Sequence, residues 1–256
     1  MKLGLVSYNL AKDWDIPTII KNCEETGFEG VELRTTHAHG VEIELSKTQR
    51  EEVKKQFADT PVEIAGLGSA FEYHSADPAE LRRNIDGTKE YAILAADVGA
   101  PGIKVRPNGV PEGADVDKTM EQIGLALREC GEFAQGHGIE VRLEVHGPAE
   151  YTSHIPTYRK IIDAANHPNV KVCWNSNQQD RLPDGTIGEN FDLLKADIGL
   201  CHITDLSNTT YPWRDLFSRL QGINYQGFCL AEVPESCEST RFMKMYRVLF
   251  DELCRA

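Results

Sequence analysis

Four side chains able to bind metal or transfer protons recur at nearly even spacing through the second half of the chain. Separated by 31, 27 and 30 positions, they are Glu144, Asn175, His202 and Glu232. Two carboxylates, an amide and an imidazole form an oxygen-rich ligand set, which suits a divalent cation such as Mn²⁺, Mg²⁺, Co²⁺ or Zn²⁺. Each residue comes at the end of a short apolar run, so the spacing predicts one ligand from each of four successive strands.

Apolar strand-like segments alternate with helical segments along the whole chain. The segments expected to be strands are 4–8, 30–34, 62–67, 102–106, 139–146, 170–175, 198–203 and 227–233. In most of the intervening segments apolar residues recur three and four positions apart, as on one face of a helix. Eight such units in 256 residues average 32 residues each, about the size of one βαβ step. The strands must then be parallel, because a helix separates each from the next.

This organisation predicts the α/β class and a single (β/α)₈ TIM barrel, with one domain over residues 1–256. The length is close to that of a typical barrel of this kind. An open doubly wound sheet would carry a glycine-rich phosphate turn after its first strand, and residues 8–13 contain no glycine. In a barrel the working residues gather at the C-terminal ends of the strands, where we expect the four ligands to meet.

Composition argues against nucleic-acid and membrane partners. Twenty-seven basic and forty acidic residues give a net charge of −13, which repels phosphate backbones and anionic lipid. We find no signal-peptide pattern at the N-terminus and no apolar run of membrane-spanning length. The seven cysteines include no C-x-x-C pair, so we expect a reducing cytoplasm, with Cys173, Cys201 and Cys229 reduced and buried. The oligomeric state is left open between a monomer and a homo-oligomer.

Four short motifs carry a resemblance to a known family. They are Arg142-Leu143-Glu144-Val145-His146-Gly147, Cys173-Trp174-Asn175, Cys201-His202-Ile203-Thr204-Asp205 and Leu230-Ala231-Glu232. Together with the openings of the second and fourth strands, they resemble the xylose isomerase-like TIM-barrel family of sugar phosphate isomerases and epimerases. In ketose 3-epimerase-like members, Glu, Asp, His and Glu hold a metal, and the two glutamates act as acid and base on either face of the substrate. The resemblance implies those catalytic roles for Glu144 and Glu232.

Two positions depart from the family pattern. Asn175 stands where the family usually has aspartate, so the four ligands supply two negative charges instead of three. Because an amide oxygen is the weaker ligand, we expect lower metal affinity. Gln178 stands where the family often has a substrate-binding histidine. A glutamine side chain can form hydrogen bonds there but cannot change its charge near neutral pH.

Further substrate-binding candidates lie just past the strand ends. They are Arg106, His146, Gln178, Asp205, Glu72 and His74. Arg106 could clamp an anion or hydroxyl, and Glu72 and His74 lie where a loop would cover the substrate. Arg106, Glu72 and His74 have an ordinary alternative as solvated side chains, and His146 and Asp205 could instead orient the neighbouring ligands. Alternatives also stand for three of the ligands. Glu144 could face outward and pair with Arg142, Asn175 could merely end a strand, and His202 could be a core histidine bonded to a backbone carbonyl.

The leading hypothesis is a divalent-metal-dependent isomerase or epimerase of carbohydrate metabolism, transferring a proton next to a carbonyl of a small keto-sugar or related polyol. A keto-sugar or keto-cyclitol dehydratase, a lyase, would use the same base with a leaving hydroxyl. A metal-free sugar-binding relative is a further alternative because of Asn175. Metal-dependent nucleic-acid cleavage is disfavoured, since a three-metal cluster would need more ligands than these strand ends offer.

Overall fold

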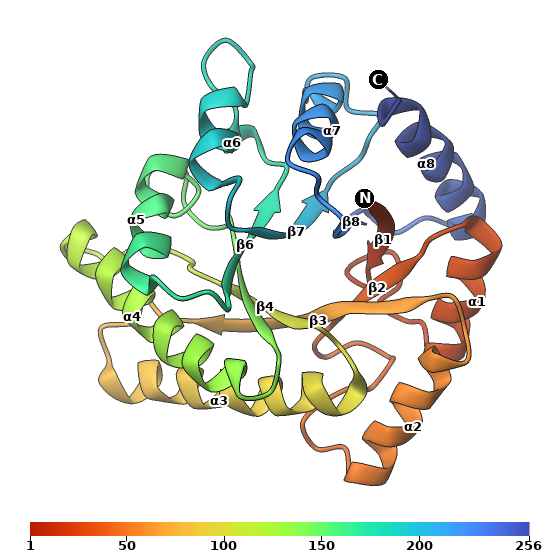
Figure 1. Ribbon diagram of the computed structural model, residues 1–256, viewed down its shortest axis with the longest axis horizontal. Coiled ribbons are helices and arrows are strands. Elements are labelled where there is room, and N and C mark those ends of the chain that lie inside the picture. The colour runs from red at the N-terminus through yellow and green to blue at the C-terminus, as the bar shows by residue number, and fades with distance from the viewer. Residues whose placement is uncertain (256) are drawn as a thin grey trace.

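Eight parallel strands close into a barrel in sequence order in the computed structural model, which describes residues 1–255 (Figure 1). Residue 256, the last of the predicted domain, lies outside the described residues. The strands are β1 Lys2–Val6, β2 Gly30–Arg34, β3 Glu63–Glu72, β4 Gly102–Arg106, β5 Glu140–Glu144, β6 Val170–Asn175, β7 Ile198–Ile203 and β8 Phe228–Ala231. The first strand pairs with the last, with Leu3 opposite Cys229. The predicted (β/α)₈ barrel is therefore confirmed.

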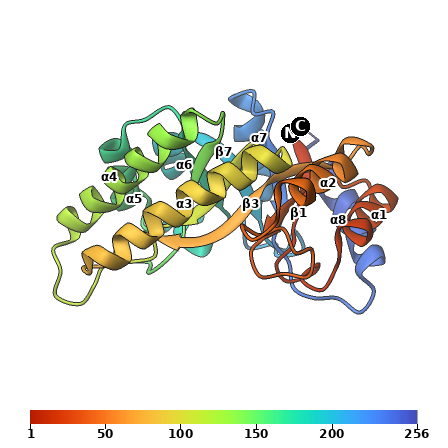
Figure 2. The same ribbon diagram turned by 90° about the horizontal axis from the view of Figure 1, so that it is seen from below.

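Helices surround the strands, and Figure 2 shows the long helices of the middle of the chain on one side of the barrel. They are α1 Ile16–Thr26, α2 Lys47–Ala58, α3 Pro78–Val98, α4 Val116–Gln135, α5 Ile155–Ala165, α6 Gly188–Leu194, α7 Trp213–Gly222 and α8 Ser239–Leu253, with a 3₁₀ turn, η1, at Gln178–Asp180. No helix among the described residues is long and apolar enough to cross a membrane.

Helices α1 to α4 each begin at a side chain that caps the first turn. In α4 the Asp115 carboxylate accepts a hydrogen bond from the Lys118 amide at 3.0 Å, which satisfies a free N–H of the first turn. The buried face of α4 includes Met120 and Ile123. A Cβ at Gly124 would lie 2.5 Å from the Ala164 Cβ, so glycine at this position allows α4 and α5 to pack closely.

Strand β3 differs most from the prediction, since it runs to Glu72 rather than ending near residue 67. Small residues from Gly68 to Ala70 interrupt the apolar pattern, but pairing with β4 resumes between Glu72 and Arg106. The longer strand brings Glu72 to the C-terminal end of the barrel.

A small apolar cluster, separate from the main core, closes the barrel interior beneath that end. It consists of Val6, Ala65, Cys173, Leu200, Phe228 and Leu230. Most of these residues are an even number of positions from Glu144, Asn175, His202 or Glu232 on their own strands, so their side chains point into the barrel as well. Cys173, Cys201 and Cys229 are buried free thiols, as predicted.

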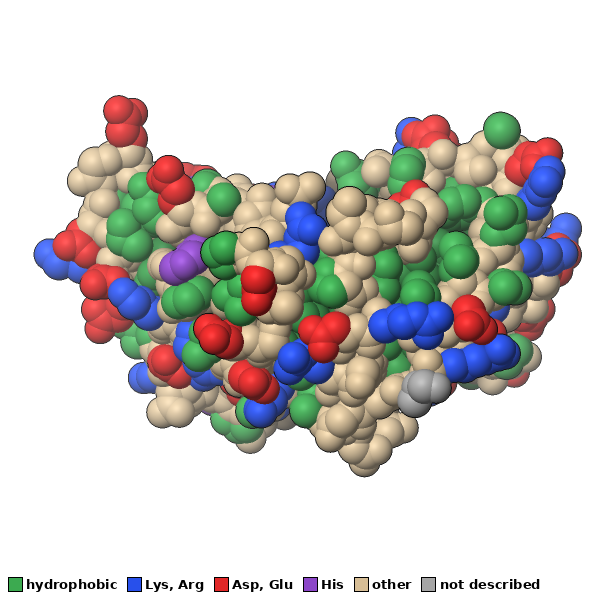
Figure 3. Space-filling model, turned by 90° about the horizontal axis from the view of Figure 1, so that it is seen from above, with side chains coloured by type: hydrophobic (Ala, Val, Ile, Leu, Met, Phe, Trp, Pro, Cys, Tyr) green, Lys and Arg blue, Asp and Glu red, His purple; other side chains and the backbone are tan. Residues whose placement is uncertain are grey.

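The outer surface shown in Figure 3 has acidic and basic side chains interspersed. That face carries no broad patch of lysine and arginine, in keeping with the net charge of −13. This face therefore lacks the basic surface to which a phosphate backbone binds.

Candidate active site

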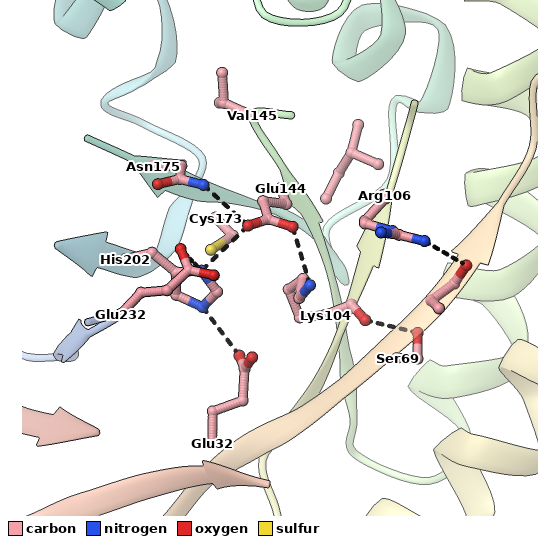
Figure 4. Close-up of polar contacts among 12 residues, drawn as sticks. Glu32, Ser69, Lys104, Arg106, Glu144, Val145, Cys173, Asn175, His202 and Glu232 are labelled. Carbon is pink, nitrogen blue, oxygen red and sulfur yellow. Dashed lines mark hydrogen bonds and ion pairs between the residues drawn. The ribbon is translucent and has the colours of Figure 1, made fainter. Parts of the chain in front are cut away.

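The four predicted ligands lie together at the C-terminal end of the barrel (Figure 4). Glu144 and Asn175 are the last residues of β5 and β6, His202 lies near the end of β7, and Glu232 directly follows β8. Asn175 and His202 are register partners on neighbouring strands. Ligand atoms of Glu144, His202 and Glu232 all lie within 4.8 Å of one another. This spacing would allow the three side chains to hold one metal ion, and the four roles as ligands stay a prediction.

Glu144 is the centre of a buried polar network. Its Oε2 accepts a hydrogen bond from Lys104 Nζ at 2.9 Å, and its Oε1 accepts one from Asn175 Nδ2 at 3.0 Å. His202 Nδ1 lies 3.3 Å from the same Oε1, and His202 Nε2 lies 3.2 Å from Glu32 Oε2. Strands β2, β4, β5, β6 and β7 thus meet through side chains inside the barrel.

Sequence reasoning did not identify Lys104 and Glu32. Both are buried in the middle of short apolar strands, with exposed fractions of 5% and 0%. Burying a charged side chain in a strand is unfavourable unless it has a charged or hydrogen-bonding partner. The lysine and the glutamate in these two apolar strands could therefore have indicated a buried polar network. What the sequence could not show is that Lys104 reaches Glu144 on the neighbouring strand β5 and that Glu32 reaches His202 across the barrel.

The two catalytic candidates have different electrostatic environments. Burial by itself raises the pKa of Glu144, but Lys104, His202 and His146 together outweigh it and hold that pKa well below its usual range. Burial also raises the pKa of Glu232, and the nearby charge of His202 offsets only part of the effect. The Glu232 side chain remains 26% exposed, whereas that of Glu144 is 3% exposed. Glu232 is therefore the more accessible and the more basic of the two.

The donor set fits a divalent cation. Burial lowers the pKa of His202, but the adjacent Cys173, Glu32 and Glu144 together raise it well above its usual value, so without a metal a protonated His202 balances the carboxylates. Its Nδ1 lies 3.3 Å from Glu144 and 3.8 Å from Glu232, and a divalent cation bound there would replace the Nδ1 proton while Nε2 stays beside Glu32. Among the described residues, Asn175 Oδ1 is buried without a hydrogen-bond partner, and a half-turn of the amide would direct it toward the same point.

A cavity of about 150 Å³ opens beside this network. It is lined by Tyr8, Arg34, Lys104, Arg106, Glu144, His146 and Glu232. Larger hollows, such as one of about 410 Å³ lined by residues of α3 and α4, lie between helices and away from the strand ends. The small cavity opens at the candidate ligands themselves, since Glu144 and Glu232 line it.

The predicted substrate-binding residues are distributed unevenly around this cavity. Arg106 and His146 line it, and Glu72 stands beside it, bonded to Arg106 at 2.6 Å. His74 Nδ1 lies 3.9 Å from Glu72. Gln178 is exposed on the turn η1, and Asp205 accepts a hydrogen bond from the Ser207 amide at 2.9 Å. Neither of these last two residues lines the cavity, and all six substrate-binding roles stay predictions.

Known proteins resemble the chain in sequence and in fold. A 3-dehydroshikimate dehydratase of Bacillus anthracis is 28% identical over 201 residues, which cover 75% of this chain and 67% of the dehydratase. The solved structure of an L-ribulose 3-epimerase superposes with a TM-score of 0.81 at 15% identity, covering 99% of this chain and 94% of the epimerase. The IOLI protein with a bound zinc atom superposes with a TM-score of 0.76 at 15% identity, covering 99% and 96%.

At these identities the similarity to the two solved structures is evidence for the fold alone. The family model described as xylose isomerase-like TIM barrel matches residues 20–246, nearly the whole chain. The motifs at the ends of β5 to β8 and the closed barrel agree with that match. The chain therefore belongs to the xylose isomerase-like TIM-barrel family.

Proposed function

We propose that the protein is a divalent-metal-dependent sugar isomerase or epimerase, which transfers a proton next to the carbonyl of a small keto-sugar or related polyol. One observation carries the proposal. Glu144, His202 and Glu232 converge within 4.8 Å of one another beside a small cavity, and Glu232 remains partly exposed to it. Oxygen and imidazole ligands next to an accessible carboxylate are what enolisation of a polyhydroxylated carbonyl compound needs.

Glu144, Asn175, His202 and Glu232 would hold the ion. When bound, it would polarise the carbonyl and the adjacent hydroxyl oxygen of the substrate. Glu232 is the base: it takes the proton from the carbon next to the carbonyl, and the electron pair moves to the carbonyl oxygen. Its raised pKa brings it closer to the working pH of a general base.

The proton must then return to the substrate. If Glu232 delivers it to the former carbonyl carbon, and the proton of the adjacent hydroxyl moves to the former carbonyl oxygen, the ketose becomes an aldose. Inversion at the original carbon needs a donor on the opposite face, and Glu144 is poorly suited to that task because Lys104 and Asn175 both donate hydrogen bonds to it. The unequal carboxylates therefore favour isomerisation over epimerisation within the proposal.

Dehydration is the second candidate. It is supported by the 28% identity to a protein named 3-dehydroshikimate dehydratase and by the presence of one accessible base. Here Glu232 would remove the proton while the hydroxyl on the next carbon leaves as water, after receiving a proton from a cavity residue. His146 lines the cavity, and its Nδ1 has no hydrogen-bond partner among residues 1–255, so it is available as that donor.

Glu232→Gln tests the proposal because an amide keeps the shape of the carboxylate but cannot accept the proton. Each protein would be incubated with Mn²⁺ in D₂O and a panel of keto-sugars, a keto-cyclitol and 3-dehydroshikimate. Solvent deuterium incorporation would be followed by NMR, and alkene formation by ultraviolet absorbance. We expect exchange by the wild type and a loss on the order of 10²–10⁴-fold in Glu232→Gln.

Glu235→Gln is the matched control, because Glu235 is an exposed residue three positions further on. It should exchange at the wild-type rate. Deuterium exchange without loss of water supports the isomerase, whereas alkene formation supports the dehydratase. If the wild type exchanges no α-proton in any compound, the enzyme proposal is wrong and a sugar-binding role replaces it.

A further inference from the structure

The cavity is richer in positive charge than the proposed proton transfer requires. Three cationic side chains line it, namely Arg34 at the end of β2 and Lys104 and Arg106 on β4. They gather in a chain whose net charge is −13. A neutral sugar would need none of them as a charge partner.

The hydrogen bonds of these cations show which are already neutralised. Lys104 is paired with Glu144 at 2.9 Å, and one terminal nitrogen of Arg106 is bonded to Glu72 at 2.6 Å. Arg34 differs: within residues 1–255 its hydrogen bonds to Ser7 and His39 use the backbone, and its guanidinium has no carboxylate partner. A half-buried guanidinium at a cavity wall is thus left without a counter-charge.

Other polar atoms at the same wall also lack partners. Arg106 Nε and His146 Nδ1 are both buried without a hydrogen bond to any described residue. A buried donor without a hydrogen bond is unfavourable, and a ligand that accepts its hydrogen bond would remove that penalty.

The local backbone is shaped to admit Arg34. A Cβ at Gly68 on the neighbouring strand β3 would lie 3.1 Å from Arg34 Cδ and 2.6 Å from Glu32 Oε1. Only the absence of a side chain at residue 68 lets the arginine stem pass over β3 while Glu32 lies beneath it. The arrangement of Arg34 is therefore built into the strand packing.

We propose that the β2–β4 side of this cavity is an oxyanion subsite, in which Arg34, assisted by Arg106 Nε, binds a carboxylate or phosphate group of the substrate. This inference rests on the proposed function and narrows its substrate class to anionic keto-sugars or keto-cyclitols. A guanidinium offers paired N–H donors that match both kinds of oxyanion. Figure 4 shows Arg106 and Glu232 on opposite sides of Lys104, so an anion held here would place the rest of a small substrate toward the base.

The test compares three ligands that share one keto-sugar skeleton: D-fructose, D-fructuronate and D-fructose 6-phosphate. Each is titrated calorimetrically into protein that has been dialysed against a chelator and then into metal-free buffer, so that the anion cannot bind through a metal. We expect at least one anionic ligand to bind on the order of tenfold or more tighter than fructose. The tighter of the two anions identifies the subsite as one for carboxylate or for phosphate.

Arg34→Gln should reduce anion affinity on the order of ten- to a hundredfold, as expected for loss of a charge-assisted contact. Arg34→Lys should keep part of the preference for anionic ligands, because it retains the positive charge. A folded Arg34→Lys protein with that preference would show that the loss of affinity in Arg34→Gln is not caused by misfolding. Arg83→Gln, an exposed change on α3 that alters the net charge equally, should bind as the wild type does. Equal binding of all three ligands, failure of both anions to bind, or an unchanged preference in Arg34→Gln would overturn the inference.

Deuterium exchange separates this inference from the function on which it rests. Exchange of fructose at equal rates in wild type and Arg34→Gln, without any preference for the anions, overturns the subsite and leaves the proton-transfer proposal standing. Anion binding that depends on Arg34, without exchange of any α-proton, supports the subsite and overturns the proton-transfer proposal.

Discussion

Asn175 decides how much negative charge the ligand set carries. Its Nδ2 donates a hydrogen bond to Glu144 Oε1, so the amide stabilises an ionised Glu144. An aspartate in its place would set two carboxylates about 3.0 Å apart, and like charges at that distance repel unless a cation lies between them. We therefore expect the amide to stabilise the metal-free site and to lower its affinity for a metal.

Asn175→Asp should therefore have two opposite effects. Affinity for Mn²⁺ should rise on the order of tenfold because the ligand set gains a charge, and the melting temperature of metal-free protein should fall because of the added repulsion. Titration calorimetry and thermal melts in metal-free buffer measure the two effects. Asn224→Asp adds the same charge at an exposed position before β8 and should do neither. Unchanged Mn²⁺ affinity in Asn175→Asp would argue against Asn175 as a ligand position.

Single residues of the site were predictable to different degrees. Glu144, His202 and Glu232 could be found because each ends a strand and the spacing repeats. Lys104 and Arg34 were missed because a strand pattern shows which side chains share a face but not which of them meet. The partner of Lys104 depends on the register between β4 and β5, and the position of Arg34 depends on the register between β2 and β3.

At the scale of elements, the turn after β6 is a feature that sequence patterns did not predict. The turn η1 leaves Gln178 exposed and carries Asp180 inward, to an exposed fraction of 1%. There Tyr211 donates a hydrogen bond to Asp180 Oδ2 at 2.5 Å, and Trp174 Nε1 donates one to the Tyr211 hydroxyl at 3.3 Å. Period-two alternation located the strands, but it contains no information on a loop of this kind.

The buried Asp180 predicts a pH-dependent stability. Burial raises the pKa of Asp180 to about 7, above its unfolded value of 3.8. The folded state therefore binds more protons than the unfolded state between these values, and the contribution of Asp180 to stability declines as the pH rises from about 4 to about 7. Between pH 5 and 8 the free energy of unfolding should fall by about 2–3 kcal/mol from this source.

Asp180→Asn removes the titrating group and should flatten the pH dependence of urea unfolding over that interval. Asp59→Asn, a change at an exposed residue after α2, should leave the wild-type slope unchanged. The same slope in Asp180→Asn and wild type would show that this carboxyl does not titrate in the folded state in the interval.

At the scale of the whole molecule, barrel closure followed from counting units rather than from any local pattern. Eight strand–helix units of about 32 residues predicted closure, and the pairing of β1 with β8 confirms it. Strand lengths were less predictable, because pairing with neighbours extends β3 past its apolar residues. The candidate ligands come from β5, β6 and β7 and from the residue after β8, so an ion bound there would join half of the barrel.

Metal binding should therefore stabilise the whole fold. The ligands converge only in the folded chain, so Mn²⁺ at about 100 times its dissociation constant should add about 2.7 kcal/mol to the free energy of unfolding. For a chain of this size the melting temperature should rise by roughly 5–10 °C. Scanning calorimetry with and without Mn²⁺ measures the shift, and a chelator should reverse it. Glu144→Gln removes one of the two ligand carboxylates, so its own melting temperature should respond little to Mn²⁺. An equal rise in wild type and Glu144→Gln would place the stabilising ion elsewhere on the acidic surface and remove the main support for a metal centre at these strand ends.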